Sequence, residues 1–261
     1  MKQRVITAII ALIILVPLII YGHRPFIVIS ILFACIGLFE LLRMYNTNKG
    51  TIFEVWAFIF LIGIVYPKQE MTLFHWTFTK YDVILLFLVG LLGIMVLSKN
   101  KFSFDQASFV FFATVYVGTA FYVLIETRML GLNYLLFILF IIWATDSGAY
   151  FVGKFLGKRK LWPEISPNKT VGGALGGLIL ALIVGAIFHL VYPFPLPWLS
   201  VIAVSLVISV VGQIGDLAAS AMKRHYHIKD FGNIFPGHGG ILDRLDSLLF
   251  VLIVLYIIQF I

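Results

Sequence analysis

The chain has 261 residues, of which 61% are hydrophobic and only 12% are charged. A soluble domain of this size has about a quarter of its residues charged, so the composition excludes a soluble globular protein. The net charge of +7 comes from lysines and arginines that lie between apolar runs. This placement indicates membrane topology, and we expect membrane lipid rather than nucleic acid as a partner.

Nine apolar runs follow one another along the chain, and each predicts a transmembrane helix. A helical span needs about 20 residues, and the alternating pattern of a membrane β-barrel is absent. The first run follows the basic segment Met1–Arg4, and because no cleavage site follows it we expect a retained span. The nine runs cover residues 5–21, 25–43, 52–66, 83–98, 107–125, 133–151, 171–192, 198–221 and 241–261.

The distribution of basic residues predicts how the chain is oriented in the membrane. With a cytoplasmic N-terminus and nine spans, fifteen of the nineteen lysines and arginines fall on the cytoplasmic side. This bias is the one that membrane proteins show toward the cytoplasm. The sequence therefore predicts an all-α polytopic membrane protein with about nine transmembrane helices and a cytoplasmic N-terminus.

Polar chemistry is concentrated in the second half of the chain. Residues 1–140 are mainly apolar spans with short loops, whereas residues 141–261 hold most of the polar side chains. These side chains gather in two predicted cytoplasmic loops, 152–170 and 222–240. We expect a single integral membrane domain, residues 1–261, in which the part from 141 to 261 supplies the catalytic helices and an active site that faces the cytoplasm.

The first polar cluster lies at the end of the sixth predicted span. Asp146 is an ionisable residue inside an apolar run, which makes it a functional candidate and a possible metal ligand. Lys169 follows a turn and precedes the seventh span, where contact with a phosphate is plausible. The basic run at 158–160 is better explained as a topology signal.

The second cluster lies at the cytoplasmic end of the eighth span. Asp216, Ser220, Lys223 and Arg224 share one helical face, because residues three and four apart are neighbours on a helix. This stripe combines a carboxylate, a hydroxyl and two cations. The alternative is a helix end whose cations reach toward water beside an internal Asp–Lys pair.

A glycine-rich loop follows, from Lys229 to Gly240. It holds four glycines and a proline within nine residues and leads directly into the last predicted helix. Loops of this kind present free N–H groups to anions at a helix N-terminus. The alternative is an ordinary turn at the start of a helix.

Two further aspartates open the ninth span. Asp243 and Asp246 are three residues apart, so they lie on the same face of a helix. One aspartate here would simply complement the helix dipole. Two aligned aspartates together with Asp216 favour an oxygen-rich site for Mg²⁺ that holds substrate phosphates.

The segment Ser220–Asp246 resembles the signature of the phosphatidate cytidylyltransferases, also called CDP-diacylglycerol synthases, over all 27 residues. Asp146–Tyr150 and Ser166–Thr170 are also similar to motifs of this family. There is one departure. The family usually has a glutamate within two positions of the Ser-Pro-x-Lys-Thr motif, where this chain has Val171 and Gly172.

The resemblance implies an enzyme of the bacterial cell membrane that uses CTP and phosphatidate to make CDP-diacylglycerol and pyrophosphate. It also implies Mg²⁺, a second monovalent cation such as K⁺, and a homodimer. We expect Asp216, Asp243, Asp246 and Lys223 to be catalytic, and the three aspartates together with Asp146 to bind metal. The expected substrate-binding residues are Lys169, Ser220, Arg224, Lys229, His238, Gly239, Gly240 and Arg244.

Two other functions compete with this interpretation. A CTP-dependent lipid-alcohol kinase, acting on polyprenol or phytol, would have a related membrane architecture, but the 27-residue match argues against it. A transporter would place charged residues near the middle of its spans and would repeat its pattern of spans. Here the charges cluster at the cytoplasmic ends, which favours an enzyme.

Overall fold

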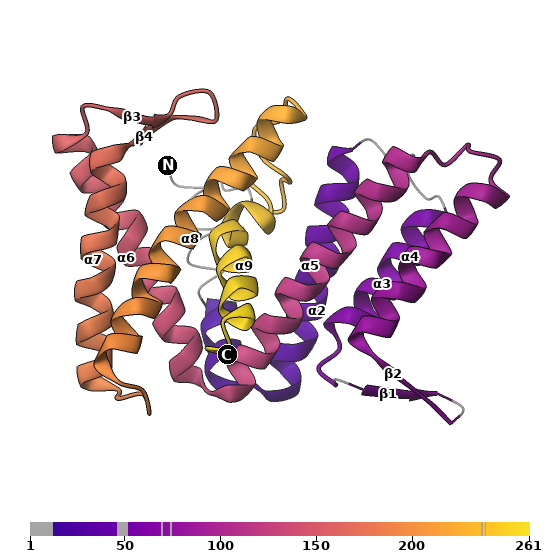
Figure 1. Ribbon diagram of the computed structural model, residues 1–261, viewed down its shortest axis with the longest axis horizontal. Coiled ribbons are helices and arrows are strands. Elements are labelled where there is room, and N and C mark those ends of the chain that lie inside the picture. Colours follow the sequence, from indigo (N-terminus) through magenta and orange to yellow (C-terminus); the bar gives the residue numbers. More distant parts are fainter. Residues whose placement is uncertain (1–12, 46–51, 69, 74, 236, 238) are drawn as a thin grey trace. The chain divides into compact units, whose positions relative to one another are not determined.

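The computed structural model describes residues 13–45, 52–68, 70–73, 75–235, 237 and 239–261 (Figure 1). The chain divides into two compact units. The first consists of Met1–Glu126 and Asp230–Asp243, and the second of Thr127–Lys229 and Arg244–Ile261. The expected single membrane domain, with mainly apolar spans in residues 1–140 and the catalytic helices in residues 141–261, stays a prediction.

The first unit is built from helices and one hairpin. Residues 13–21 are helical, and α2 (His23–Met44), α3 (Ile52–Val65), α4 (Lys80–Leu97) and most of α5 (Phe104–Leu130) follow. Strands β1 (Glu70–Leu73) and β2 (Trp76–Thr79) pair antiparallel, with Glu70 opposite Thr79. The apolar pattern does not predict this hairpin, although threonine and aromatic residues favour strands. Thr79 then begins α4, because its side chain accepts a hydrogen bond from Asp82 N.

The second unit contains the helices that carry most of the polar residues. These are α6 (Leu132–Leu156), α7 (Val171–Val191), α8 (Trp198–His225) and most of α9 (Leu242–Ile257). A second antiparallel hairpin, β3 (Lys160–Trp162) and β4 (Ser166–Thr170), joins α6 to α7. Helices α6, α7 and α8 pack against one another (Figure 1).

The predicted class, an all-α polytopic membrane protein, is confirmed. In the described part of the chain, α2, α4, α5, α6, α7 and α8 are long and apolar enough to cross a membrane. Helices α3 and α9 have 14 and 16 residues, fewer than the usual span of about 20. The first predicted run lies partly outside the described residues. On α4, Val89 and Val96 are 65% and 70% exposed, as expected of side chains that face lipid.

The two loops predicted to be cytoplasmic are shorter than expected. Helix α6 continues to Leu156 and α8 to His225, past the ends of the apolar runs. Lysines and arginines at these ends have long side chains that reach water while the backbone stays helical. The remaining part of the 152–170 loop is mainly the β3–β4 hairpin, in which Lys160 lies opposite Thr170.

Glycines allow α6 and α7 to approach until their backbones touch. A Cβ atom added to Gly148 would lie 2.6 Å from the carbonyl oxygen of Gly176. One added to Gly177 would lie 2.7 Å from the carbonyl oxygen of Thr145. Small residues at such contacts let helices pack closely in a membrane. This contact sets the distance between the helix that carries Asp146 and the hairpin that precedes α7.

We expect Gly177→Ala to lower stability, because a methyl group there meets a backbone oxygen rather than a movable side chain. Overpacking of this kind costs roughly 1–3 kcal/mol. Gly93→Ala is the matched control, since Gly93 is exposed on α4 and a Cβ added there would meet nothing within 4 Å. Thermal unfolding of both variants in detergent checks this, and equal midpoints for the two variants would contradict it.

Candidate active site

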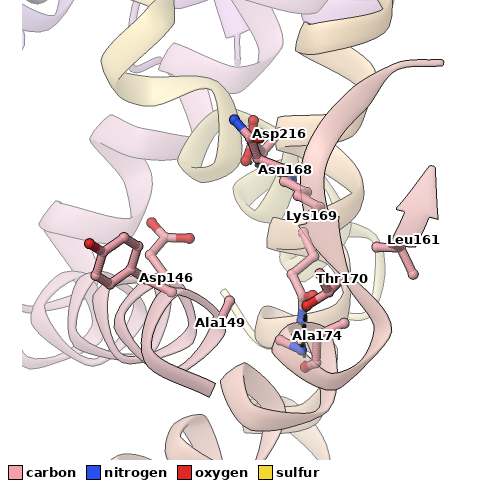
Figure 2. A pocket seen from close by; sticks show the side chains of 11 residues that line it. Asp146, Ala149, Leu161, Asn168, Lys169, Thr170, Ala174 and Asp216 are labelled. Atoms are coloured by element: carbon pink, nitrogen blue, oxygen red, sulfur yellow. Dashed lines mark hydrogen bonds and ion pairs between the residues drawn. The ribbon is translucent and has the colours of Figure 1, made fainter. Parts of the chain in front are cut away.

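A pocket of about 320 Å³ lies in the second unit between α6, α7, α8 and the β3–β4 hairpin (Figure 2). Helices α6 and α8 and the hairpin contribute polar side chains to its wall, and α7 contributes Gly173 and Ala174. The lining residues are Asp146, Ala149, Tyr150, Leu161, Asn168, Lys169, Thr170, Gly173, Ala174, Gln213 and Asp216. The pocket therefore brings together residues 70 positions apart in the sequence.

Thr170 anchors the strand that carries Lys169. Its side chain is 6% exposed, and its Oγ1 accepts a hydrogen bond of 3.1 Å from Gly173 N at the start of α7. A threonine at this position caps a helix by satisfying one of its free N–H groups. The hairpin is closed by a hydrogen bond of 2.9 Å from Val171 N to Arg159 O. Lys169 is thus held at the pocket by its neighbours in the chain.

Lys169 forms an ion pair with Asp216 of α8, with 2.6 Å between Nζ and Oδ2. The two side chains are 26% and 37% exposed, so the pair remains open to the pocket. The other oxygen of Asp216, Oδ1, is 3.5 Å from the Ser220 hydroxyl that donates to it. This contact confirms that Asp216 and Ser220 are neighbours on one face of a helix. The sequence did not indicate that the partner of Asp216 would come from the hairpin.

Asp146 lines the same pocket from α6 (Figure 2). Its carboxylate interacts electrostatically with both Asp216 and Lys169, repelling the first and attracting the second. Two carboxylates at one pocket suit Mg²⁺, which is commonly held by one or two protein carboxylates together with substrate phosphates. In the residues that the structure describes, no three His, Cys, Asp or Glu side chains form a group that could hold a metal ion.

Asp246 lies on α9, close to where α9 packs against α8. A Cβ atom on Gly215 would lie 2.7 Å from Phe250 Cβ and 3.3 Å from the carbonyl oxygen of Asp246. Gly215 precedes Asp216, so the backbones that carry the two aspartates approach each other at this glycine. The Asp246 carboxylate accepts a hydrogen bond of 2.7 Å from Ser247 N.

Asp243 holds the glycine-rich loop of the first unit. Its Oδ2 accepts hydrogen bonds from Phe231 N at 2.8 Å and from Gly240 N at 2.9 Å. Gly239 has a φ of +86°, and a Cβ there would lie 2.7 Å from the same oxygen. Two N–H groups of the loop are thus bound by a carboxylate of the chain itself, and substrate binding by Gly239 and Gly240 stays a prediction. Spacing cannot distinguish these outcomes, because both use the same free N–H groups.

The other predicted site residues lie at the ends of α8 and α9 or between these two helices. Lys223 and Arg224 are in the last turn of α8, Arg244 is in the first turn of α9, and Lys229 lies between them. Arg224, Lys229 and Arg244 are exposed. His238 lies outside the described residues. Asp243 belongs to one unit and the other three aspartates to the second, so their convergence on one metal stays a prediction.

Sequence reasoning missed two polar residues inside apolar helices. Glu40 of α2 is 3% exposed and accepts hydrogen bonds from the backbone at the start of α9. Gln213 of α8 lines the pocket and donates a hydrogen bond of 3.4 Å to the carbonyl oxygen of Ala174. The rule that identified Asp146, an ionisable residue within an apolar run, would also have found Glu40.

Gly172 stands where relatives of the resembled family usually carry a glutamate. A Cβ atom there would lie 3.3 Å from the carbonyl oxygen of Leu156 and 3.6 Å from Gly157 Cα. The start of α7 is therefore close to the end of α6 at this position. A Cβ atom at this position would already require the neighbouring backbone to move by a few tenths of an ångström.

Comparison of the sequence with known proteins places the chain in a family. The model of the cytidylyltransferase family matches residues 2–261. The phosphatidate cytidylyltransferase of Bacillus subtilis (strain 168) is 46% identical over 98% of this chain and 96% of its own length. Proteins of the same name from Staphylococcus saprophyticus and Staphylococcus aureus (strain COL) are 43% and 42% identical, over 99% of this chain and 98% of their own lengths. The chain therefore belongs to the cytidylyltransferase family.

Proposed function

We propose that this chain transfers the cytidylyl group of CTP to phosphatidate, giving CDP-diacylglycerol and pyrophosphate. The observation that carries the proposal is the identity of 42–46% to phosphatidate cytidylyltransferases over almost the whole of both chains. The pocket supplies suitable chemistry, because it combines carboxylates from α6 and α8 with a lysine from the β3–β4 hairpin. The family that the signature Ser220–Asp246 resembles is the one that the comparisons identify.

The reaction joins two polyanions and needs no strong base. An oxygen of the phosphatidate phosphate forms a bond to the α-phosphorus of CTP. The bond from that phosphorus to the bridging oxygen breaks, and pyrophosphate leaves with the electron pair. A phosphate monoester has its second pKa near 6, so it is already a dianion and a nucleophile at neutral pH. The main task of the protein is to position the two phosphates and to offset their charge.

Lys169 is the cation best placed to contact a phosphate. Its ammonium group lies at the pocket and pairs with Asp216, and three donors allow it to bind a phosphate oxygen as well. Asp146 and Asp216 would hold Mg²⁺, which when bound would neutralise charge on the triphosphate. The metal roles of Asp243 and Asp246 and the phosphate contacts of Lys223, Arg224 and Lys229 are supported by the resemblance. A monovalent cation such as K⁺ rests on the resemblance alone.

The proposed setting is a bacterial cell membrane, with the active site facing the cytoplasm. Support for the membrane comes from the six long apolar helices found among the described residues and from bacterial relatives. Support for the orientation comes from the fifteen basic residues predicted on the cytoplasmic side. A homodimer is proposed from the family resemblance.

The purified chain in detergent with CTP, Mg²⁺ and phosphatidate should release one pyrophosphate for each CDP-diacylglycerol formed. A lipid-alcohol kinase would instead release CDP when given polyprenol. Separating the nucleotide and lipid products by chromatography distinguishes the two activities. CDP formation from polyprenol, with no pyrophosphate from phosphatidate under conditions in which the Bacillus subtilis relative works, would overturn the proposal.

We expect Lys169→Gln and Asp216→Asn each to lower kcat/KM by about a hundredfold, the size typical for loss of one charged group at a reacting phosphate or carbonyl. Because the two side chains form one ion pair, kcat/KM of the double variant should be little lower than that of the less active single variant. Lys158→Gln is the control, since Lys158 is exposed and outside the pocket lining. If the fold loss of kcat/KM in the double variant equals the product of the two single losses, the pair does not act as a unit.

Asp246→Asn should abolish turnover while expression, membrane insertion and thermal stability remain near those of the parent chain. The physical reason is that an amide keeps the shape of the side chain but removes the charge that a metal requires. Turnover and melting temperature measured on the same preparation check this. Retained activity would remove Asp246 from the proposed metal site.

A further inference from the structure

Glu40 is a carboxylate buried in an apolar helix. It lies in α2, between residues that are mostly hydrophobic, and only 3% of its surface is exposed. Its Oε1 accepts a hydrogen bond of 2.9 Å from Ile241 N, and its Oε2 accepts one of 3.0 Å from Leu242 N. Both oxygens thus bind the N-terminus of α9, about 200 residues further along the chain.

The hydrogen bonds explain how a carboxyl group can be accommodated at this position. A buried carboxylate without partners is strongly destabilising. The first N–H groups of a helix have no partner within the helix, and the positive end of the helix dipole attracts an anion. The oxygens of Glu40 therefore accept from N–H groups that have no partner within α9, and these N–H groups supply the donors that the buried carboxylate needs. The interaction depends on close contact.

Two glycines make this close contact possible. A Cβ atom on Gly240 would clash with Glu40 Oε1, and one on Gly232 would clash with the same oxygen. No side chain can occupy either position without displacing the carboxylate. The glycines at both ends of the loop thus form a cradle for Glu40.

Asp243 completes the arrangement. It accepts hydrogen bonds from Phe231 N and Gly240 N, while Glu40 accepts those from Ile241 N and Leu242 N. Four backbone N–H groups at the two ends of the loop are thus bound by two carboxylates. We use the term loop clamp for Glu40 and Asp243 together with these four groups.

We propose that Glu40 is a positioning residue for cytidylyl transfer. By holding the loop and the first residues of α9, it sets the direction in which Arg244 and Asp246 are presented. Leu242 N is four residues before Asp246, which is about one turn of the helix. Glu40 touches no substrate in this account and acts through α9. The inference rests on the proposed function, because it assigns Asp246 to that reaction.

The main competing explanation is that Glu40 merely stabilises the fold. Glu126 offers a control, because it is a carboxylate in an apolar helix of the same unit, is partly buried and interacts with Lys80. Glu126→Gln removes a partly buried carboxylate without touching the loop clamp. Glu40→Gln keeps the size of the side chain but replaces one acceptor oxygen with an NH₂ group that cannot accept from an N–H donor.

The experiment compares Glu40→Gln, Gly240→Ala and Glu126→Gln by kinetics, melting temperature and hydrogen exchange of peptides that cover residues 228–247. We expect Glu40→Gln and Gly240→Ala to lower kcat by about tenfold or more with smaller changes in the KM values for CTP and phosphatidate. The amides of residues 231 and 240–242 should exchange faster in both variants, with other helices unchanged. Glu126→Gln should keep kcat even if its melting temperature falls.

The readouts separate failure of the inference from failure of the proposed function. Normal kcat in Glu40→Gln, or a loss of kcat that simply follows the melting temperature across all three variants, would overturn the positioning role. Unchanged exchange in the 228–247 peptides would overturn the loop clamp itself. A parent chain that makes no CDP-diacylglycerol would overturn the proposed function, whereas the exchange measurement would still test the clamp.

Discussion

The structure depends on one constraint: a polar group inside a membrane protein must find its partner within the protein. Hydrocarbon offers no hydrogen bonds, so unpaired charges and backbone groups are costly there. In this chain, Lys169 meets Asp216, Asp243 meets the N–H groups of its loop, and Glu40 meets the start of α9. Each pairing joins segments that are distant in the sequence or separated by a turn, and so positions the elements that carry chemistry.

Glycine is the second means by which these elements are positioned. Gly148 and Gly177 bring α6 and α7 together, Gly215 brings α9 against α8, and Gly232 and Gly240 admit the Glu40 carboxylate. Without Cβ atoms, backbones approach closely enough for short polar side chains to reach across helices. In the signature segment, Gly232 and Gly240 thus leave room for the Glu40 carboxylate, and substrate binding by Gly239 and Gly240 stays a prediction.

Much of the fold follows from local sequence. Apolar runs of 15 to 24 residues predict helices, and the predicted ranges agree with most helix bounds to within a few residues. The larger differences occur at the C-terminal ends of α5, α6 and α8, where each helix continues past the apolar run, at the end of α9, which is shorter, and at the two hairpins. Strands of three to five residues carry too few side chains to produce a distinct pattern.

The sequence by itself determined the membrane class, the residues capable of phosphate chemistry and, through its resemblance, the family. Those properties depend on composition, local spacing and a continuous 27-residue motif. Only the tertiary structure decided which groups are partners: that Asp216 pairs with Lys169 from a hairpin, that Asp146 shares their pocket, and that Glu40 binds the start of α9. Hydrogen bonds and ion pairs depend on distances across the fold, and a linear pattern does not contain those distances.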